Sequence, residues 1–304
     1  MIDYQNFKIG NGQILEGLYA DPELRFWDVR AYIYPTTDGY ADWSGTKFFV
    51  FVSEDGRSFA RRGPIVDLES GQAPWATGCA WAPCAAEKDG KYYFYFCGRR
   101  KNGEMAIGAA AAPTPEGPFT AMPEPLVTME AVRRQGIAPD QIIDPSVYEE
   151  DGSHWLLFGN GTPTIVQLAE DMMHLLPETM RALQGARDFR EAITVFRRRG
   201  LYHFTWSCDD TRSEDYHVNY GTSQSLFGPI DYQYPILRKA PEKGVLGTGH
   251  HAIAQPPGTE RYVIAYHRFA TPVEKYRGKE GFYREVCWGE LSFGEDGRIL
   301  PVEV

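Results

Sequence analysis

Five short runs rich in aromatic residues recur along the 304-residue chain, and each follows a stretch typical of a turn. Consecutive runs lie 60, 63, 47 and 60 residues apart, beginning at Tyr32, Tyr92, Trp155, Tyr202 and Tyr262. Glycine, which readily supplies the positive φ of a tight hairpin, stands just before four of them, at Gly90, Gly152, Gly200 and Gly258. Repeats of this length, made of strands and turns, are typical of propeller blades.

Most of the repeats contain a further strand-like segment, at residues 47–52, 105–111, 218–222 and 285–291. Three repeats end in a Gly-Pro pair, at residues 63–64, 117–118 and 228–229, and an outer edge strand tolerates proline. A β-sandwich would not recur five times in register. We therefore predict an all-β fold, a five-bladed β-propeller with four-stranded antiparallel blades around a central channel, as a single domain over residues 1–304. The best helix candidate is residues 175–184.

Composition excludes several classes of partner. With 41 acidic and 31 basic side chains the net charge is −10, whereas binding to nucleic acid needs clustered Lys and Arg. No apolar stretch approaches the roughly 20 residues that span a membrane. The five cysteines contain no CxxC pair, so we expect buried thiols in a reducing compartment. Residues 1–6 lack signal-peptide features, which favours a cytoplasmic protein, although a trimmed signal would look the same.

One position of the repeat concentrates functional residue types. The residues 11 places before the aromatic runs are Asp21, Trp81, Asp144, Glu191 and His251. Each should open the innermost strand of its blade, and proline directly after Asp21 and Asp144 favours an extended backbone there. Three carboxylates at one mouth of the channel destabilise a fold unless they are used or bind metal. This pattern predicts an active site.

Paired carboxylates carry out glycoside hydrolysis. One stays protonated to donate to the leaving oxygen, and the other is ionised to activate water or to attack the anomeric carbon. A third carboxylate near the acid raises the pKa of that acid by like-charge repulsion. Trp81 either stacks on a sugar ring or lines the channel as core. His251, next to His250, is either a structural histidine or a ligand of a cation or water cluster.

Several motifs, in order over almost the whole chain, carry a family likeness. They are Tyr19-Ala20-Asp21-Pro22, Trp81-Ala82-Pro83, Ile143-Asp144-Pro145-Ser146-Val147, Glu191 leading into Phe196-Arg197-Arg198, Gly247-Thr248-Gly249-His250-His251 and Tyr266-His267-Arg268. With these motifs the chain resembles glycoside hydrolase family 43, five-bladed propeller enzymes that release arabinose or xylose from plant polysaccharides. One departure is Ala192-Ile193 after Glu191, where many members have Gly-Pro or Ala-Pro.

The resemblance implies a role for each matching residue. Asp21 would be the general base, Glu191 the general acid, and Asp144 the residue that tunes and orients the acid. The family inverts the anomeric centre, so base and acid should lie roughly 6.5–9.5 Å apart. His251 resembles a histidine that often holds a calcium ion or a water network on the axis, and no cofactor is implied for the chemistry. Arg284 resembles an arginine that reaches sugar hydroxyls, the alternative being a surface charge.

The substrate is expected to be a small oligosaccharide. Residues 37–46, with Trp43, and residues 129–141 are long for propeller connections and could wall a pocket. The expected sugar-binding residues are Trp81, Arg284, Trp43 and His250. We expect an exo-acting α-L-arabinofuranosidase, with β-D-xylosidase close behind and β-galactofuranosidase more distant. Alternatives from other classes are a non-catalytic glycan-binding propeller and a calcium-dependent hydrolase such as a lactonase. The sequence does not indicate an oligomeric state.

Overall fold

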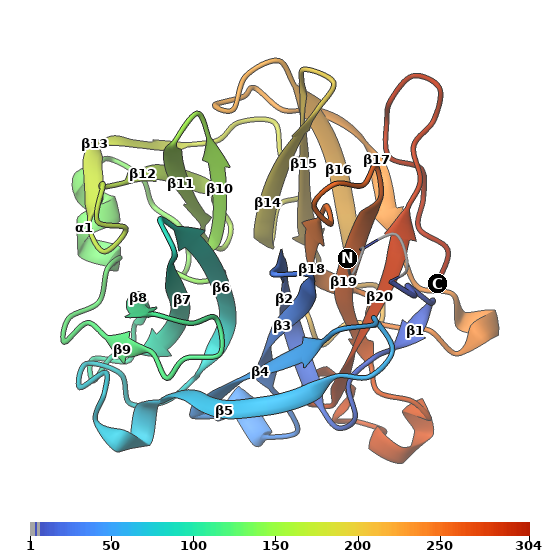
Figure 1. The fold of residues 1–304 in the computed structure, drawn as a ribbon, viewed down its shortest axis with the longest axis horizontal. Coiled ribbons are helices and arrows are strands. Elements are labelled where there is room, and N and C mark those ends of the chain that lie inside the picture. Colours follow the sequence, from blue (N-terminus) through green and yellow to red (C-terminus); the bar gives the residue numbers. More distant parts are fainter. Residues whose placement is uncertain (1–3, 5–6) are drawn as a thin grey trace.

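The structure, a computed structural model, describes Tyr4 and residues 7–304. Within these residues the strands form five antiparallel sheets of four strands each, arranged as blades in a ring (Figure 1). This arrangement confirms the predicted five-bladed β-propeller. The five aromatic runs fall in the second strand of successive blades, as their recurrence predicts.

The strands follow the chain blade by blade. The first two blades comprise β2 (Tyr19–Trp27), β3 (Arg30–Thr37), β4 (Lys47–Ser53) and β5 (Ala60–Asp67), then β6 (Trp81–Lys88), β7 (Lys91–Arg99), β8 (Met105–Ala112) and β9 (Thr120–Ala121). The third and fourth comprise β10 (Ser146–Glu150), β11 (Ser153–Phe158), β12 (Thr164–Leu168) and β13 (Leu175–Ala182), then β14 (Glu191–Arg198), β15 (Leu201–Cys208), β16 (His217–Ser223) and β17 (Asp231–Leu237).

The fifth blade joins the two ends of the chain. It comprises β18 (Gly249–Ala254), β19 (Tyr262–Phe269), β20 (Arg284–Leu291) and the N-terminal strand β1 (Gly12–Gln13). β1 pairs antiparallel with β20, with Gly12 opposite Trp288 and Gln13 opposite Cys287. The ring is therefore closed by strand pairing between its first and last segments, a connection that the repeat spacing does not reveal.

Alternation along the strands builds the core between neighbouring blades. In β7, Tyr93 and Tyr95 belong to a cluster shared with the third blade, whereas Phe94 and Phe96 belong to one shared with the first blade. Successive side chains of a strand point to opposite faces of its sheet, so each blade contributes to two such clusters. Five buried clusters of this kind fill the interfaces around the ring. They leave the ends of the inner strands available for polar side chains.

The predicted helix at residues 175–184 is wrong. Leu175–Ala182 is β13, the outer strand of the third blade, with Leu175 opposite Leu168 and Ala182 opposite Thr164. Pro177 is compatible with an edge strand but not with a helix interior. The α-helix of the described residues is α1 (Met129–Arg134), between β9 and β10, and the Thr128 side chain accepts a hydrogen bond from the Ala131 N–H at its start.

All five cysteines lie in the described part of the chain, where each is buried and unpaired. The prediction of buried thiols is therefore confirmed, while the cellular compartment stays a prediction. Among the described residues, no helix combines the length and the apolar character needed to cross a membrane.

Candidate active site

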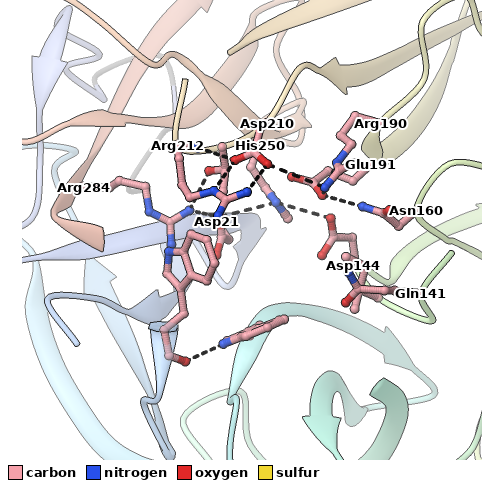
Figure 2. A pocket seen from close by; sticks show the side chains of 14 residues that line it. Asp21, Gln141, Asp144, Asn160, Arg190, Glu191, Asp210, Arg212, His250 and Arg284 are labelled. Atoms are coloured by element: carbon pink, nitrogen blue, oxygen red, sulfur yellow. Dashed lines mark hydrogen bonds and ion pairs between the residues drawn. The ribbon is translucent and has the colours of Figure 1, made fainter. Parts of the chain in front are cut away.

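One pocket lies where the starts of the inner strands converge. Its volume is about 210 Å³, and the side chains that line it come from all five blades and from the loops between them (Figure 2). The lining residues are Asp21, Trp43, Trp81, Gln141, Ile143, Asp144, Asn160, Arg190, Glu191, Asp210, Thr211, Arg212, His250 and Arg284. The structure thus brings together every predicted catalytic and sugar-binding residue, and leaves His251 outside the lining.

An irregular backbone at the start of each inner strand aims these side chains. Each blade has one non-glycine residue with positive φ at this point: Asp21, Ala82, Asp144, Ala192 and His250. The register with the second strand also shifts there in the first, second, fourth and fifth blades. Bulges of this kind re-aim side chains beside functional sites, and a positive φ in a non-glycine residue is strained. A strained backbone at or beside the predicted site residue is therefore also repeated from blade to blade.

Asp21 lies among cationic and imidazole groups. Arg284 Nη1 donates to Asp21 Oδ1 at 3.1 Å, and the Nδ1 atoms of His267 and His250 lie 3.0 and 3.4 Å from the same oxygen. Burial by itself would raise the pKa of Asp21, but the Arg284 charge and the two histidines outweigh it and hold the pKa well below its usual range. Asp21 is therefore ionised at neutral pH.

Arg284 is itself held by a second carboxylate, Asp38. Its Nε and Nη2 atoms donate to Asp38 Oδ2 and Oδ1 at 2.9 and 3.2 Å, and its backbone N–H donates to Oδ2 at 2.9 Å. Both residues are buried, so the alternative of Arg284 as a surface charge is wrong. A bidentate pair of this kind fixes the guanidinium plane. Sequence reasoning did not single out Asp38, although it lies in the connection expected to wall the pocket.

Glu191 is held at both carboxyl oxygens. The Tyr216 hydroxyl donates to Oε1 at 2.8 Å, the Asn160 side-chain amide donates to Oε2 at 2.8 Å, and Arg190 Nε lies 3.8 Å from Oε2. Burial raises the pKa of Glu191, and the pKa stays above its usual value although the Tyr216 hydrogen bond and Arg190 lower it. Neither Tyr216 nor Asn160 was predicted, because neither stands at the repeated position.

Asp144 lacks the cation that Asp21 has. Its Oδ2 atom is buried and has no hydrogen-bond partner among the described residues, and the nearest imidazole nitrogen, His250 Nδ1, lies 3.6 Å away. Burial, together with the charges of Glu191 and Asp21, raises the pKa of Asp144 well above its usual range. Like charges repel, so ionisation of either carboxyl group makes ionisation of the other less favourable. The pocket therefore combines one carboxyl group of lowered pKa with two carboxyl groups of raised pKa.

Two tryptophans form one wall. Trp81 Nε1 donates to the Trp43 carbonyl at 2.6 Å, and the two rings meet edge to face with centroids 6.1 Å apart. Trp43 Nε1 donates in turn to the Gly281 carbonyl at 2.8 Å. The loop at residues 37–46 is thereby tied to the fifth blade. It lines the pocket through Trp43, and residues 129–141 line it through Gln141, as expected.

Part of the rim was not predicted. Asp210, Thr211 and Arg212 come from the loop between β15 and β16, at the same end of the ring as the loop of Trp43. Arg212 is paired with Asp210 through Nε and Nη2, at 2.7 and 2.6 Å. Their position in the chain could have indicated this role. The loop joins the second and third strands of the fourth blade, as residues 37–46 do in the first blade.

His251 is buried beside the pocket. Its Nε2 atom lies 2.6 Å from Thr205 Oγ1, and its Nδ1 atom has no hydrogen-bond partner among the described residues. Over the same part of the chain, no three His, Cys, Asp or Glu side chains gather where they could hold a metal ion. Calcium takes six to eight oxygen ligands, which a single imidazole does not supply. Whether His251 holds a calcium ion or a water network therefore stays a prediction.

Several known proteins are similar to this chain over almost its whole length. A β-D-galactofuranosidase of Aspergillus niger is 29% identical over 315 residues, covering 98% of this chain and 86% of the relative. A xylosidase/arabinosidase of Humicola insolens is 29% identical, covering 92% of this chain and 95% of the relative. A solved structure of a family 43 enzyme from Xanthomonas citri, complexed with xylotriose, has a TM-score of 0.78 and 26% identity, covering 96% of this chain and 93% of that one.

The sequence model of one family, the glycosyl hydrolases of family 43, matches residues 12–299. This match takes in all five blades, from the closing strand β1 to the end of the fifth blade. The chain belongs to glycoside hydrolase family 43.

Proposed function

We propose that this glycoside hydrolase releases terminal α-L-arabinofuranosyl residues from short oligosaccharides with inversion of the anomeric centre. The observation that carries the proposal is the division of charge in the pocket. The pKa of Asp21, beside Arg284, is lowered, whereas the pKa values of Asp144 and Glu191 are raised, which favours a proton on that pair. Hydrolysis of a glycoside requires one carboxylate of each kind.

Each group has one role in the proposed reaction. Asp21 accepts a proton from a water molecule, whose oxygen attacks the anomeric carbon on the face opposite the leaving group. Glu191 donates its proton to the glycosidic oxygen as the carbon–oxygen bond breaks. Asp144 keeps the proton on Glu191 at neutral pH by opposing a second negative charge. The products are the free sugar and the shortened oligosaccharide, and Asp21 and Glu191 then exchange protons with solvent.

The size of the pocket supports exo action. Its volume of about 210 Å³ is below the roughly 300–1,000 Å³ of sites for drug-sized ligands, and suits one sugar ring rather than a chain. Trp43 and Trp81 close one side, and Arg212 lies at the rim. Arg284 and His250 are proposed to bind hydroxyl groups of the terminal sugar, since both line the pocket beside Asp21.

Terminal β-D-xylosyl residues are the second candidate. Two comparisons favour them, the xylotriose complex of the Xanthomonas citri enzyme and the double xylosidase/arabinosidase name of the Humicola insolens relative. β-D-Galactofuranosyl residues are a third candidate, on the name of the Aspergillus niger relative.

Initial rates on three p-nitrophenyl glycosides test the proposal. The substrates are the α-L-arabinofuranoside, the β-D-xyloside and the β-D-galactofuranoside, with folded Asp21→Ala protein as the blank. We expect the arabinoside to be fastest, and the Asp21→Ala variant to lose about 10²–10⁴-fold in rate, since that is the usual contribution of a general base. A higher rate on the xyloside or the galactofuranoside would contradict the arabinofuranosyl specificity and assign that other sugar. Absence of turnover on all three substrates would contradict an exo-glycosidase.

A further inference from the structure

We infer that Tyr216 is a positioning residue for Glu191, and that its hydroxyl group sets the upper pH limit at which Glu191 can still donate a proton. The inference rests on the proposed function, since it assigns Tyr216 to the acid of that reaction. Tyr216 does not line the pocket, so it acts on the substrate only through Glu191.

Hydrogen bonds from two blades fix the Glu191 carboxyl group. The Tyr216 hydroxyl, from the loop before β16 of the fourth blade, donates to Oε1 at 2.8 Å. The Asn160 amide, just beyond β11 of the third blade, donates to Oε2 at 2.8 Å (Figure 2). Both donors are fully buried, so water does not compete for either oxygen. The plane of the carboxyl group is therefore set by two donors that come from different blades.

The Tyr216 ring is held as firmly as its hydroxyl. It stacks on His267, with ring centroids 5.5 Å apart and planes inclined by 6°. On another side it lies against Gly249, where a Cβ atom would overlap the tyrosine ring. His267 Nδ1 in turn lies 3.0 Å from Asp21 Oδ1. Two stacked rings thus connect the residue proposed as acid with the residue proposed as base.

The Tyr216 hydroxyl lowers the pKa of Glu191 because it donates a hydrogen bond to the carboxyl group. A hydroxyl that donates to a carboxylate stabilises the ionised form and lowers the pKa of the acid. Burial raises the pKa of Glu191, as does the charge of Asp21, whereas the Tyr216 hydroxyl opposes this rise together with Arg190 and Arg284. Removal of the hydroxyl should therefore move the loss of the proton to higher pH.

The same hydrogen bond serves the reaction. Glu191 becomes a carboxylate as its proton passes to the leaving oxygen, and the Tyr216 and Asn160 donors then face the new negative charge. Preorganised donors accelerate a step when they stabilise charge that develops in the transition state. A poor leaving group needs the most proton transfer, so its hydrolysis should depend most on Tyr216.

Tyr216→Phe tests this inference against Tyr220→Phe as a matched control. Tyr220 is equally buried, and its hydroxyl lies 2.7 Å from His203 Nδ1, away from the pocket. For Tyr216→Phe we expect the alkaline limb of the kcat/KM profile to move up by about one pH unit, the effect of one hydrogen bond to a charged group. We also expect kcat to fall about tenfold on an oligosaccharide and less on a p-nitrophenyl glycoside, with KM nearly unchanged. Equal losses on both substrates with an unmoved limb would overturn the inference.

A titration by carboxyl ¹³C NMR separates this inference from the proposed function. The Glu191 signal, assigned by its absence in Glu191→Gln, should titrate at higher pH in Tyr216→Phe and unchanged in Tyr220→Phe. An unmoved midpoint overturns the inference whatever the activity, whereas a moved midpoint in a protein inactive on every glycoside overturns the proposed function alone. If Tyr216→Phe fails to fold, Asn160→Ala removes the donor at the other oxygen and should move the midpoint in the same direction.

Discussion

Asp21 and Asp144 stand at equivalent positions of the first and third blades, yet their surroundings drive their pKa values in opposite directions. Burial acts to raise the pKa of Asp21, but Arg284, which donates a hydrogen bond to it, and the two histidines together outweigh burial and lower the pKa. Asp144 has no such partner, so burial and the charges of Glu191 and Asp21 raise its pKa. The repeat therefore places the carboxyl groups, and their individual neighbours assign the chemistry.

Asp144→Asn should lower the pH at which the acid loses its proton. The substitution removes the negative charge that opposes ionisation of Glu191, so the alkaline limb of the pH–rate profile should move down by about one pH unit or more. Profiles of kcat/KM for wild type and variant on one p-nitrophenyl glycoside measure the shift. An alkaline limb that stays in place would contradict the role of Asp144 in tuning the acid.

At the scale of the element, the strands and the carboxylates were predictable because both follow the hairpin repeat. The distance from each aromatic run to the start of its inner strand is nearly constant, which placed Asp21, Asp144 and Glu191 at one mouth. Most partners of these residues were not predictable. Asp38 contacts Arg284 across 246 positions of the chain, and Asn160 contacts Glu191 from another blade. Such contacts depend on how blades close into a ring, which local patterns do not encode.

The closing strand was missed for a related reason. β1 comprises only Gly12–Gln13, too short for an alternating pattern, and its partner β20 lies at the other end of the chain. The strand at residues 175–182 was mistaken for a helix because an outer edge strand lacks the regular alternation of a central one. Both errors concern outer strands, where packing restricts the sequence least.

Ile14→Pro tests whether pairing of the N-terminal segment with β20 stabilises the ring. The Ile14 N–H donates to the Val286 carbonyl at 2.9 Å, and proline has no N–H to donate. We expect Ile14→Pro to lower the free energy of unfolding by about 1–3 kcal/mol more than Ile14→Ala, which removes the side chain but keeps the donor. Chemical denaturation of the two variants measures the difference. Equal stability of the two would show that this pairing does not hold the ring together.

At the scale of the whole molecule, the pocket is a stability cost that the interfaces between blades offset. The folded state raises the pKa of Asp144 above its unfolded value, so the fold favours the protonated form. This cost is absent below the unfolded pKa of about 3.9, grows as pH rises from there to the folded pKa, and is constant above it. Five buried clusters around the ring supply the opposing apolar burial.

Asp144→Asn should therefore stabilise the protein at neutral pH while it impairs activity. We expect the Tm of the variant to exceed that of wild type by a few degrees at pH 7.5, and the gain to shrink toward pH 4, where both side chains are neutral. Asp188→Asn, at an exposed position with the same left-handed backbone, is the control and should leave the Tm unchanged at pH 7.5 and at pH 4. Thermal unfolding of the three proteins at both pH values measures these Tm differences. A lower Tm of Asp144→Asn than of wild type at pH 7.5 would contradict the stability cost of buried Asp144.

In the proposed reaction Glu191 supplies the proton to the leaving group while Asp21 activates water. The measurement that tests it most directly compares Glu191→Ala with wild type on an arabino-oligosaccharide and on a 2,4-dinitrophenyl glycoside, whose leaving group departs without a proton. We expect a loss of about 10²–10⁴-fold on the oligosaccharide and a far smaller loss on the dinitrophenyl glycoside. Equal losses on the two substrates would contradict Glu191 as the acid.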